Sequence, residues 1–175
     1  MFNDSPRKSK NGFALILKKF PKTDSWYVLL QYRSQTMTRM PGFIGCPGGR
    51  YEGEEDSLQA VVRETEEETG WIFKPERFTK INEGKNCDWY FVIKIDKPKN
   101  HTYTDIKTIG EIQDTNKLIS KHRNWKCIRS MTPGHFWMPI ESIDQLIQHR
   151  GIDGKTKIMG GLISRVKQSA DILSS

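Results

Sequence analysis

A run of charged side chains between residues 63 and 68 of this 175-residue chain has the types and the spacing that metal chemistry needs. Glu64, Glu67 and Glu68 stand at positions i, i+3 and i+4, so in a helix their carboxylates share one face. Glu66 adds a fourth negative charge, and only Arg63 offsets them within the run. Like charges at i and i+4 cost a helix roughly 0.2–0.5 kcal/mol. A bound divalent cation would reverse the sign of that cost, whereas the alternative interpretation is a solvated acidic face.

A helix over residues 57–69 is the element that must position these glutamates. Asp56 or Ser57 can cap its start, and Gly70 can end it. The face opposite the glutamates carries an inner stripe at helical spacing, made of Leu58, Val61, Val62, Thr65 and Thr69. The cluster lies in the C-terminal half of this helix, where the macrodipole disfavours anions. Several local rules are broken together, which is typical of functional sites.

Short apolar runs on both sides of the helix predict strands. They cover residues 12–17, 25–33, 42–46, 71–74, 79–83, 89–95 and 135–138. The first two runs predict a hairpin, because residues 21–24 between them supply turn chemistry. Two further helices are predicted over residues 142–150 and 155–173, the second weakened by Gly160 and Gly161. This mixture predicts an α/β or α+β layered fold, with residues 1–10 as a flexible lead-in and 11–175 as a single domain.

The pattern around the glutamates extends from Gly49 to Trp71 as GRYEGEEDSLQAVVRETEEETGW. It resembles the Nudix box, in which a Gly, a Glu, an Arg-Glu pair, a Glu-Glu pair and a final Gly recur at fixed spacing. Every fixed Gly, Glu and Arg is in register here. Thr65 and Trp71 stand where the family usually has aliphatic residues. Both are packing positions, so these departures concern the core and leave the chemistry intact.

The resemblance implies the Nudix fold, a mixed β-sheet sandwiched between α-helices with a loop–helix–loop motif. It also implies hydrolysis of a nucleoside diphosphate linked to another group, with Mg²⁺ or Mn²⁺ as cofactor. Carried over position by position, the metal ligands are Glu64, Glu67, Glu68 and the carbonyl of Gly49. The resemblance further implies that Arg63 holds a box glutamate in place, that Glu55 helps to fix the loop and that Gly70 closes the motif.

Mg²⁺ prefers oxygen ligands, and metals both neutralise a diphosphate and lower the pKa of an attacking water. A general base is still required. One box glutamate can serve, or a carboxylate from a distant loop, for which Glu111 is our candidate. Glu83 and Asp114 compete with Glu111, and each of the three has an ordinary surface carboxylate as its alternative interpretation.

The box does not identify the substrate, which we expect to be a nucleoside triphosphate, a dinucleoside polyphosphate or a similar compound. Tyr90 stands where its spacing from the box resembles a mark of dinucleoside polyphosphate hydrolases, although we favour the alternative interpretation of a plain strand aromatic. Trp125, within the basic segment 121–129, can stack on a base or lie in the core. Arg39 and Arg50 are further candidates to contact the substrate, because both lie near the box in the predicted layout.

The formal net charge of +7 indicates a surface that raises the local concentration of anionic substrates or holds an RNA backbone. mRNA cap hydrolysis is therefore an alternative activity, and a non-catalytic module that binds nucleotide or RNA is an alternative of another class. The intact box favours an enzyme over such a module. No apolar run approaches the ~18 residues of a membrane span. No secretory signal is visible, so we expect an intracellular, cytoplasmic protein without a membrane partner.

Overall fold

The computed structural model of this chain describes residues 10–20, 24–35, 37–83, 86–95, 126–127 and 134–175. Within these ranges the strands are β1 (Asn11–Phe20), β2 (Ser25–Tyr32), β3 (Ile44–Gly45), β4 (Gly48–Arg50), β5 (Thr79–Glu83), β6 (Cys87–Ile93), β7 (Lys126–Cys127) and β8 (His135–Pro139). The helices are α1 (Ser57–Thr69) and α3 (Leu162–Ser174), with 3₁₀ segments η1 (Pro75–Arg77) and η2 (Ile140–Gln148). None of the helices in this described part has the length and apolarity that crossing a membrane requires.

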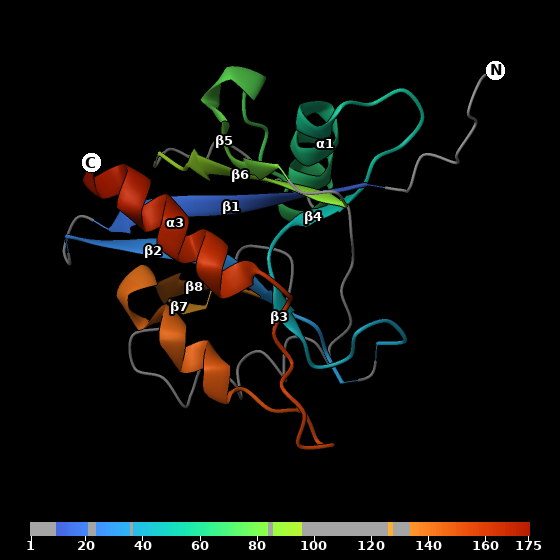
Figure 1. Ribbon diagram of the computed structural model, residues 1–175, viewed down its shortest axis with the longest axis vertical. Helices are drawn as coiled ribbons and strands as arrows, with labels where there is room; N and C mark the ends of the chain where they lie inside the picture. The colour runs from blue at the N-terminus through green and yellow to red at the C-terminus, as the bar shows by residue number, and fades with distance from the viewer. Residues whose placement is uncertain (1–9, 21–23, 36, 84–85, 96–125, 128–133) are drawn as a thin grey trace.

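The described strands form one mixed sheet in the order β5-β6-β1-β2-β8-β7, with β3 paired to β2 and β4 paired to β1. β1 and β2 form the predicted antiparallel hairpin, and β1 runs parallel to β6. The remaining pairs are antiparallel. β1 is therefore the central strand, with β6 on one side and both β2 and β4 on the other (Figure 1).

Helices cover both faces of the sheet, so β1 is buried on both sides. Ala14 and Ile16 point into the core cluster that packs against α1, while Leu15 and Leu17 point into the cluster that includes residues of α3 and η2. All four side chains are fully buried. A strand buried on both faces has a continuous apolar sequence, which is why residues 12–17 show no alternation. The sandwich of helices around a mixed sheet, visible in Figure 1, confirms the predicted fold class.

The structure corrects three of the predicted elements. Residues 71–74 form no strand, because Trp71 and Phe73 are buried in the α1-side cluster while the chain turns at Pro75 into η1. Burial of every second residue imitates the period of a strand without any strand pairing. The predicted helix over residues 142–150 is the 3₁₀ segment η2. The last helix begins at Leu162 rather than residue 155, because Gly161, with φ of 81°, is its N-cap.

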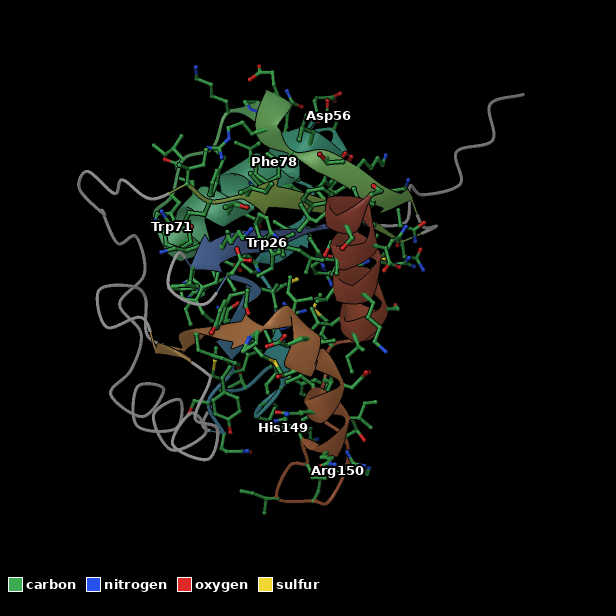
Figure 2. The ribbon with its side chains drawn as sticks, turned by 90° about the vertical axis from the view of Figure 1, so that its left-hand side faces the viewer. Trp26, Asp56, Trp71, Phe78, His149 and Arg150 are labelled. Atoms are coloured by element: carbon green, nitrogen blue, oxygen red, sulfur yellow. The ribbon has the colours of Figure 1, made fainter. Side chains whose placement is uncertain are left out.

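Helix α1 has the predicted bounds, and both of its ends are capped. At the start, the Asp56 side chain accepts a hydrogen bond from the Gln59 amide at 2.8 Å, and the Gln59 side chain accepts one from the Asp56 amide at 2.9 Å. This capping box stabilises the helix start by about 1 kcal/mol. At the other end, Gly70 adopts a left-handed conformation with φ of 75° and donates to the Glu66 carbonyl. Figure 2 labels Asp56 and Trp71 at these two ends.

The left-handed Gly70 gives a stability prediction. We expect Gly70→Ala to lower the free energy of unfolding by about 1 kcal/mol, because a Cβ is disfavoured at positive φ. Chemical denaturation monitored by circular dichroism measures this change. Gly160→Ala is the control and should keep wild-type stability, since Gly160 has no positive φ and nothing within 4 Å of an added Cβ. An unchanged Gly70→Ala protein would show that the C-cap does not hold the helix end.

Candidate active site

The candidate motif begins on β4 and is brought to α1 by the sheet. Gly49 pairs with Gly12 of β1, and Arg50 pairs with Asn11. The next residue, Tyr51, donates its backbone N–H to the Lys10 carbonyl at 3.0 Å. Residues 51–56 then lead into α1, which packs over β1 and β4. The strand therefore delivers the Gly49 backbone directly beneath the glutamate face of the helix.

The Glu64 carboxylate lies against the Gly49 backbone, in the space that a side chain at Gly49 would occupy. A Cβ at Gly49 would stand 2.3 Å from Oε1 of Glu64 and 2.5 Å from its Cδ. The Glu64 side chain is only 15% exposed, so this close approach is enclosed. Two groups that the family resemblance assigns to one metal, the Gly49 backbone and the Glu64 carboxylate, are thus in contact although they come from different elements.

Arg63 lies at the centre of the cluster and binds carboxylates on both sides of it. Its Nε donates to Oε1 of Glu55 at 2.6 Å, and one terminal nitrogen donates to the other oxygen of Glu55 at 3.1 Å. The second terminal nitrogen donates to Glu64 at 3.0 Å and to Glu67 at 3.1 Å. The first also donates to the Arg50 carbonyl at 3.0 Å. A planar guanidinium is the side chain that can hold several oxygens in this fixed geometry.

Glu68 binds the start of β4, at the turn between β3 and β4. Its Oε2 accepts a hydrogen bond from the Gly48 amide at 3.1 Å. Its charge also acts on the buried Cys46 thiol, whose pKa is raised well above the ordinary value, first by burial and then by Glu68. The glutamates are therefore held in two groups, with Glu64 and Glu67 on Arg63 and Glu68 on the turn.

The carboxylates of the cluster differ in their electrostatics. The hydrogen bonds from Arg63 hold the pKa of Glu55 below its usual value, which keeps this carboxylate ionised. Burial raises the pKa of Glu64, although the hydrogen bond from Arg63 acts in the opposite direction. The pKa of Arg63 is itself raised, chiefly by its hydrogen bonds to Glu55. Burial thus disfavours the ionised form of Glu64, and a bound cation would offset that cost.

The raised pKa of Glu64 predicts a pH-dependent stability of the metal-free protein. Because the folded-state pKa lies above the unfolded-state value, stability falls as pH rises from about 4.5 through the folded pKa. Neutral Glu64→Gln escapes that penalty. We therefore expect this variant to have a higher melting temperature than wild type at pH 7 in EDTA, with the difference shrinking toward pH 4.

Thermal unfolding followed by circular dichroism measures this effect. Glu66→Gln is the control, since Glu66 is an exposed glutamate on the same helix. A Glu64→Gln protein that melts below wild type at pH 7 would show that the bond from Arg63 outweighs burial.

The donor set fits a hard divalent cation, although the carboxylates are not gathered around one point. Within the described residues, no three acidic, histidine or cysteine side chains come together as a metal cluster. Glu64 and Glu67 instead share the cationic Arg63. Carboxylates beside a glycine backbone are nonetheless the kind of oxygen ligands that Mg²⁺ takes. The fit therefore rests on the Gly49–Glu64 contact and the chemistry of the donors.

The other predicted site residues differ in their exposure and in their hydrogen-bond partners. Arg50 follows Gly49 and is exposed, whereas Arg39 is an exposed loop residue whose carbonyl accepts from Arg33. Tyr90 is 6% exposed, beneath α1, with its hydroxyl 2.5 Å from that of Ser57. This burial favours the interpretation of Tyr90 as a core aromatic of the strand. Glu111, Asp114 and Trp125 lie outside the described residues, as does the side chain of Glu83.

Two residues of the cluster had no specific role in the sequence prediction. The Glu52 carboxylate forms an ion pair with Arg63, with Oε1 of Glu52 3.6 Å from a terminal nitrogen of Arg63. The Glu52 amide donates to Oε2 of Glu55 at 3.0 Å. Gly48 supplies the amide that binds Glu68, and a Cβ there would lie 2.3 Å from the Gly12 carbonyl. Both fall at positions that the motif leaves unspecified, so only the surplus of acidic residues and the double glycine indicated them.

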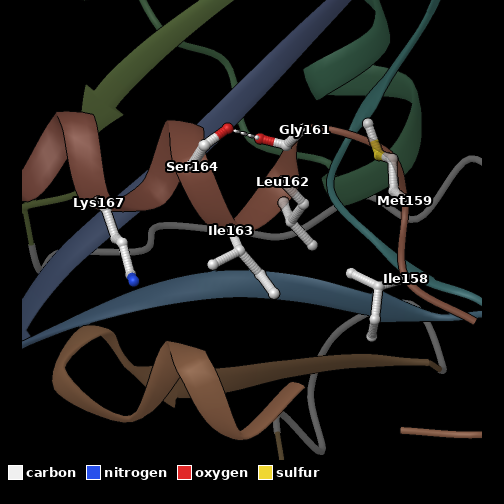
Figure 3. A pocket seen from close by; sticks show the side chains of 7 residues that line it. All are labelled: Ile158, Met159, Gly161, Leu162, Ile163, Ser164 and Lys167. Atoms are coloured by element: carbon white, nitrogen blue, oxygen red, sulfur yellow. Dashed lines mark hydrogen bonds between the residues drawn. The ribbon is translucent and has the colours of Figure 1, made fainter. Parts of the chain in front are cut away.

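A pocket on the other face of the sheet lacks the groups that an active site for this chemistry needs. It is lined by Ile158, Met159, Gly161, Leu162, Ile163, Ser164 and Lys167 around the first turns of α3 (Figure 3). Its polar side chains already have partners, since Ser164 donates to the Gly161 carbonyl at 3.0 Å and Lys167 pairs with Asp144 at 2.7 Å. The remaining lining is apolar and carries no group suited to phosphate chemistry.

Similar folds occur among solved structures at low sequence identity. A MutT/nudix family protein from Enterococcus faecalis superposes with a TM-score of 0.57 at 13% identity, covering 100% of this chain. This chain spans only 66% of that protein's length. An Ap4A hydrolase from C. elegans gives a TM-score of 0.53 at 16% identity, covering 94% of this chain and 98% of its own.

The NUDIX domain of Shewanella oneidensis NrtR, solved with ADP ribose, gives a TM-score of 0.55 at 14% identity, covering 98% of this chain and 94% of its own. At these identities the likeness shows the fold alone. No curated protein sequence matches the chain. Residues 12–157, most of the chain including the whole glutamate motif, match the family described as NUDIX domain. The chain therefore belongs to the NUDIX domain family.

Proposed function

We propose that this NUDIX pyrophosphohydrolase uses Mg²⁺ or Mn²⁺ to hydrolyse a diphosphate linkage in a nucleoside diphosphate derivative. The observation that carries the proposal is the contact between the Glu64 carboxylate and the Gly49 backbone, in which a Cβ would come within 2.3 Å. Burial raises the pKa of Glu64, so its ionised form is costly at this position. A packing role alone would not require an ionisable side chain against the Gly49 backbone.

The residues of the chain have distinct tasks in this proposal. Glu64, Glu67, Glu68 and the Gly49 carbonyl would hold the metal ion, which when bound would neutralise the diphosphate and acidify a water. Arg63 is a positioning residue, because its hydrogen bonds tie Glu64 and Glu67 to Glu55 and to the Arg50 carbonyl. The exposed Arg50, next to Gly49, would bind a substrate phosphate. Glu111 remains our candidate for the general base.

For the substrate we propose a nucleoside triphosphate or a dinucleoside polyphosphate. The fold likeness includes an Ap4A hydrolase and a domain that binds ADP ribose, and these ligands share a diphosphate next to a nucleoside. The net charge of +7 supports an anionic substrate of either kind. We also propose that residues 11–175 are a single domain that acts in the cytoplasm.

A substrate panel tests the proposal. Wild type, Glu68→Gln and Glu66→Gln are incubated with nucleoside triphosphates, dinucleoside polyphosphates, ADP ribose and capped RNA, with Mg²⁺, with Mn²⁺ or with EDTA. We expect wild type and Glu66→Gln to release phosphate-containing products only with metal, and Glu68→Gln to lose nearly all activity. Glu66 is exposed on the same helix and lies outside the proposed ligand set, so it matches the charge change.

Two other results would change the conclusion. Capped RNA as the preferred substrate, with binding that weakens steeply with salt, would assign mRNA decapping. Tight nucleotide or RNA binding by wild type, with no turnover of any compound under any condition, would replace the enzyme with a non-catalytic binding module.

A further inference from the structure

A buried polar network lies on the sheet beneath the start of α1, outside the ligands assigned above. The Tyr51 hydroxyl donates to Oδ2 of Asp88, a β6 residue that is only 3% exposed. Ser57, the first residue of α1, contacts the Tyr51 hydroxyl and also the Tyr90 hydroxyl. Because Asp88 and Tyr90 are two apart on β6, both side chains point to the same face of the sheet.

Tyr51 reaches Asp88 by crossing the central strand. Gly12 of β1 pairs with Gly49 on one side and with Asp88 on the other. A Cβ at Gly12 would lie 3.4 Å from Cε1 of Tyr51 and 2.6 Å from Cγ2 of Val61. The Tyr51 ring therefore passes over the backbone of Gly12, and the neighbour that an added side chain there would clash with is Val61.

The bond to Tyr51 is the anchor of a buried carboxylate. Among the groups that the structure describes, Oδ1 of Asp88 has no hydrogen-bond partner, so the Tyr51 hydroxyl on Oδ2 bears the stabilisation of this side chain. A buried acid whose side-chain partner is a tyrosine of the motif loop is costly unless that bond is made.

We infer that Tyr51 and Asp88 form a tie that positions the backbone of residues 49 and 50, and thereby the proposed metal site, from the inside of the protein. Tyr51 directly follows the Arg50 carbonyl, which binds Arg63, and stands two residues after the Gly49 carbonyl, a proposed metal ligand. The loop is held from outside by Arg63 and from inside by Asp88. Tyr51 is thus a positioning residue of the reaction.

Binding of Mn²⁺ alone, measured by electron paramagnetic resonance, tests the tie together with kcat and KM. We expect Tyr51→Phe to weaken Mn²⁺ binding by about tenfold and to lower kcat with little change in KM, the size of effect that groups supporting metal ligands commonly have. Tyr27→Phe is the matched control. Tyr27 is 4% exposed in the α1-side core cluster, on β2 and away from the motif loop, so loss of its hydroxyl should leave both quantities unchanged.

The double variant Tyr51→Phe/Asp88→Asn separates positioning from general stability. Tyr51→Phe leaves a buried carboxyl group without its donor and should lower the melting temperature, whereas the added Asp88→Asn removes that carboxyl group and should recover much of the loss. The loop stays untied in the double variant, so its Mn²⁺ affinity should stay about tenfold weak. Wild-type Mn²⁺ affinity in the double variant, once stability has recovered, would overturn the inference.

The inference rests on the proposed function for its metal readout, and hydrogen exchange provides an independent one. The Tyr51 amide donates to the Lys10 carbonyl, and the Glu52 amide donates to Glu55. Both amides should exchange faster in Tyr51→Phe and in the double variant than in Tyr27→Phe. If wild type bound no Mn²⁺ and cleaved nothing, the proposed function would fail while the link between Tyr51 and Asp88 could still hold. Equal exchange of both amides in all variants would reject that link.

Discussion

Glu67→Gln should lower kcat for diphosphate hydrolysis by on the order of a thousandfold while leaving the fold intact. Glu67 is a proposed metal ligand whose side chain is 50% exposed, so the change removes one negative charge without opening the core. The amide of glutamine keeps the size of the side chain but is a weaker ligand for a hard cation. The reaction should suffer mainly in kcat, because the metal acts most strongly on the charge that develops as the bond breaks.

Initial rates over a range of substrate and Mg²⁺ concentrations measure this loss. Excess Mg²⁺ should recover part of the activity if the variant binds metal weakly. Glu66→Gln changes the same charge one residue earlier, on an exposed part of the same helix, and should keep wild-type kcat. Equal losses in the two variants would indicate that the net charge of α1, rather than a ligand at residue 67, controls the rate.

Arg63→Lys should reduce both stability and activity, although it keeps the positive charge. Lysine cannot bind Glu55 through two nitrogens while also reaching Glu64, Glu67 and the Arg50 carbonyl. We expect the free energy of unfolding to fall by about 2 kcal/mol, since charged hydrogen bonds are lost at a side chain that is still 22% exposed. We expect kcat to fall between ten- and a hundredfold, because the ligands lose their support.

Chemical denaturation and steady-state kinetics measure the two effects separately. Arg77→Lys is the control, since Arg77 also bonds a backbone carbonyl, that of Ile93, but stands on η1, outside the proposed ligands and the Arg63 contacts. Its activity should stay at the wild-type level. Wild-type stability and kcat in Arg63→Lys would mean that a point charge suffices and that the forked geometry is incidental.

The sequence predicted those elements whose local signals agree with one another. Helix α1 combines an inner stripe, a capping residue and a terminal glycine, and its bounds match the prediction at both ends. The strand over residues 79–83 also matches. The prediction of a strand over residues 71–74 was wrong because Trp71 and Phe73 are buried and the residues after them are exposed, as in a strand. The chain there packs on the α1-side core without pairing to a strand. Periodicity reports which side chains are buried, and pairing has to be known separately.

The family motif predicted the ligand candidates together with Arg63 and Glu55 as their supports, whereas the supports that come from other strands had no signal in the sequence. Spacing alone placed Glu64, Glu67 and Glu68 on one helical face, and their membership of a family motif assigned the roles. The hydrogen bond from Tyr51 to Asp88 joins the loop after β4 to β6, so no local sequence pattern predicts it. The same holds for the Glu68 bond to the Gly48 amide. Tertiary contacts of this kind depend on sheet topology, which a single sequence does not reveal.

The position of β1 also bears on the order in which the protein can assemble during synthesis. β1 is synthesised before β6, yet it pairs in parallel with β6, so that Asn11 must wait for Cys87. Pairings between distant segments close late and slow the folding of a domain. A nascent chain that ends before β6 can form α1 and the hairpin of β1 and β2, but Tyr51 would lack Asp88. We expect such a ribosome-bound chain to contain a formed helix α1, while the loop over residues 51–56 is not yet held by Asp88. The proposed metal site should therefore form late in the synthesis of the protein.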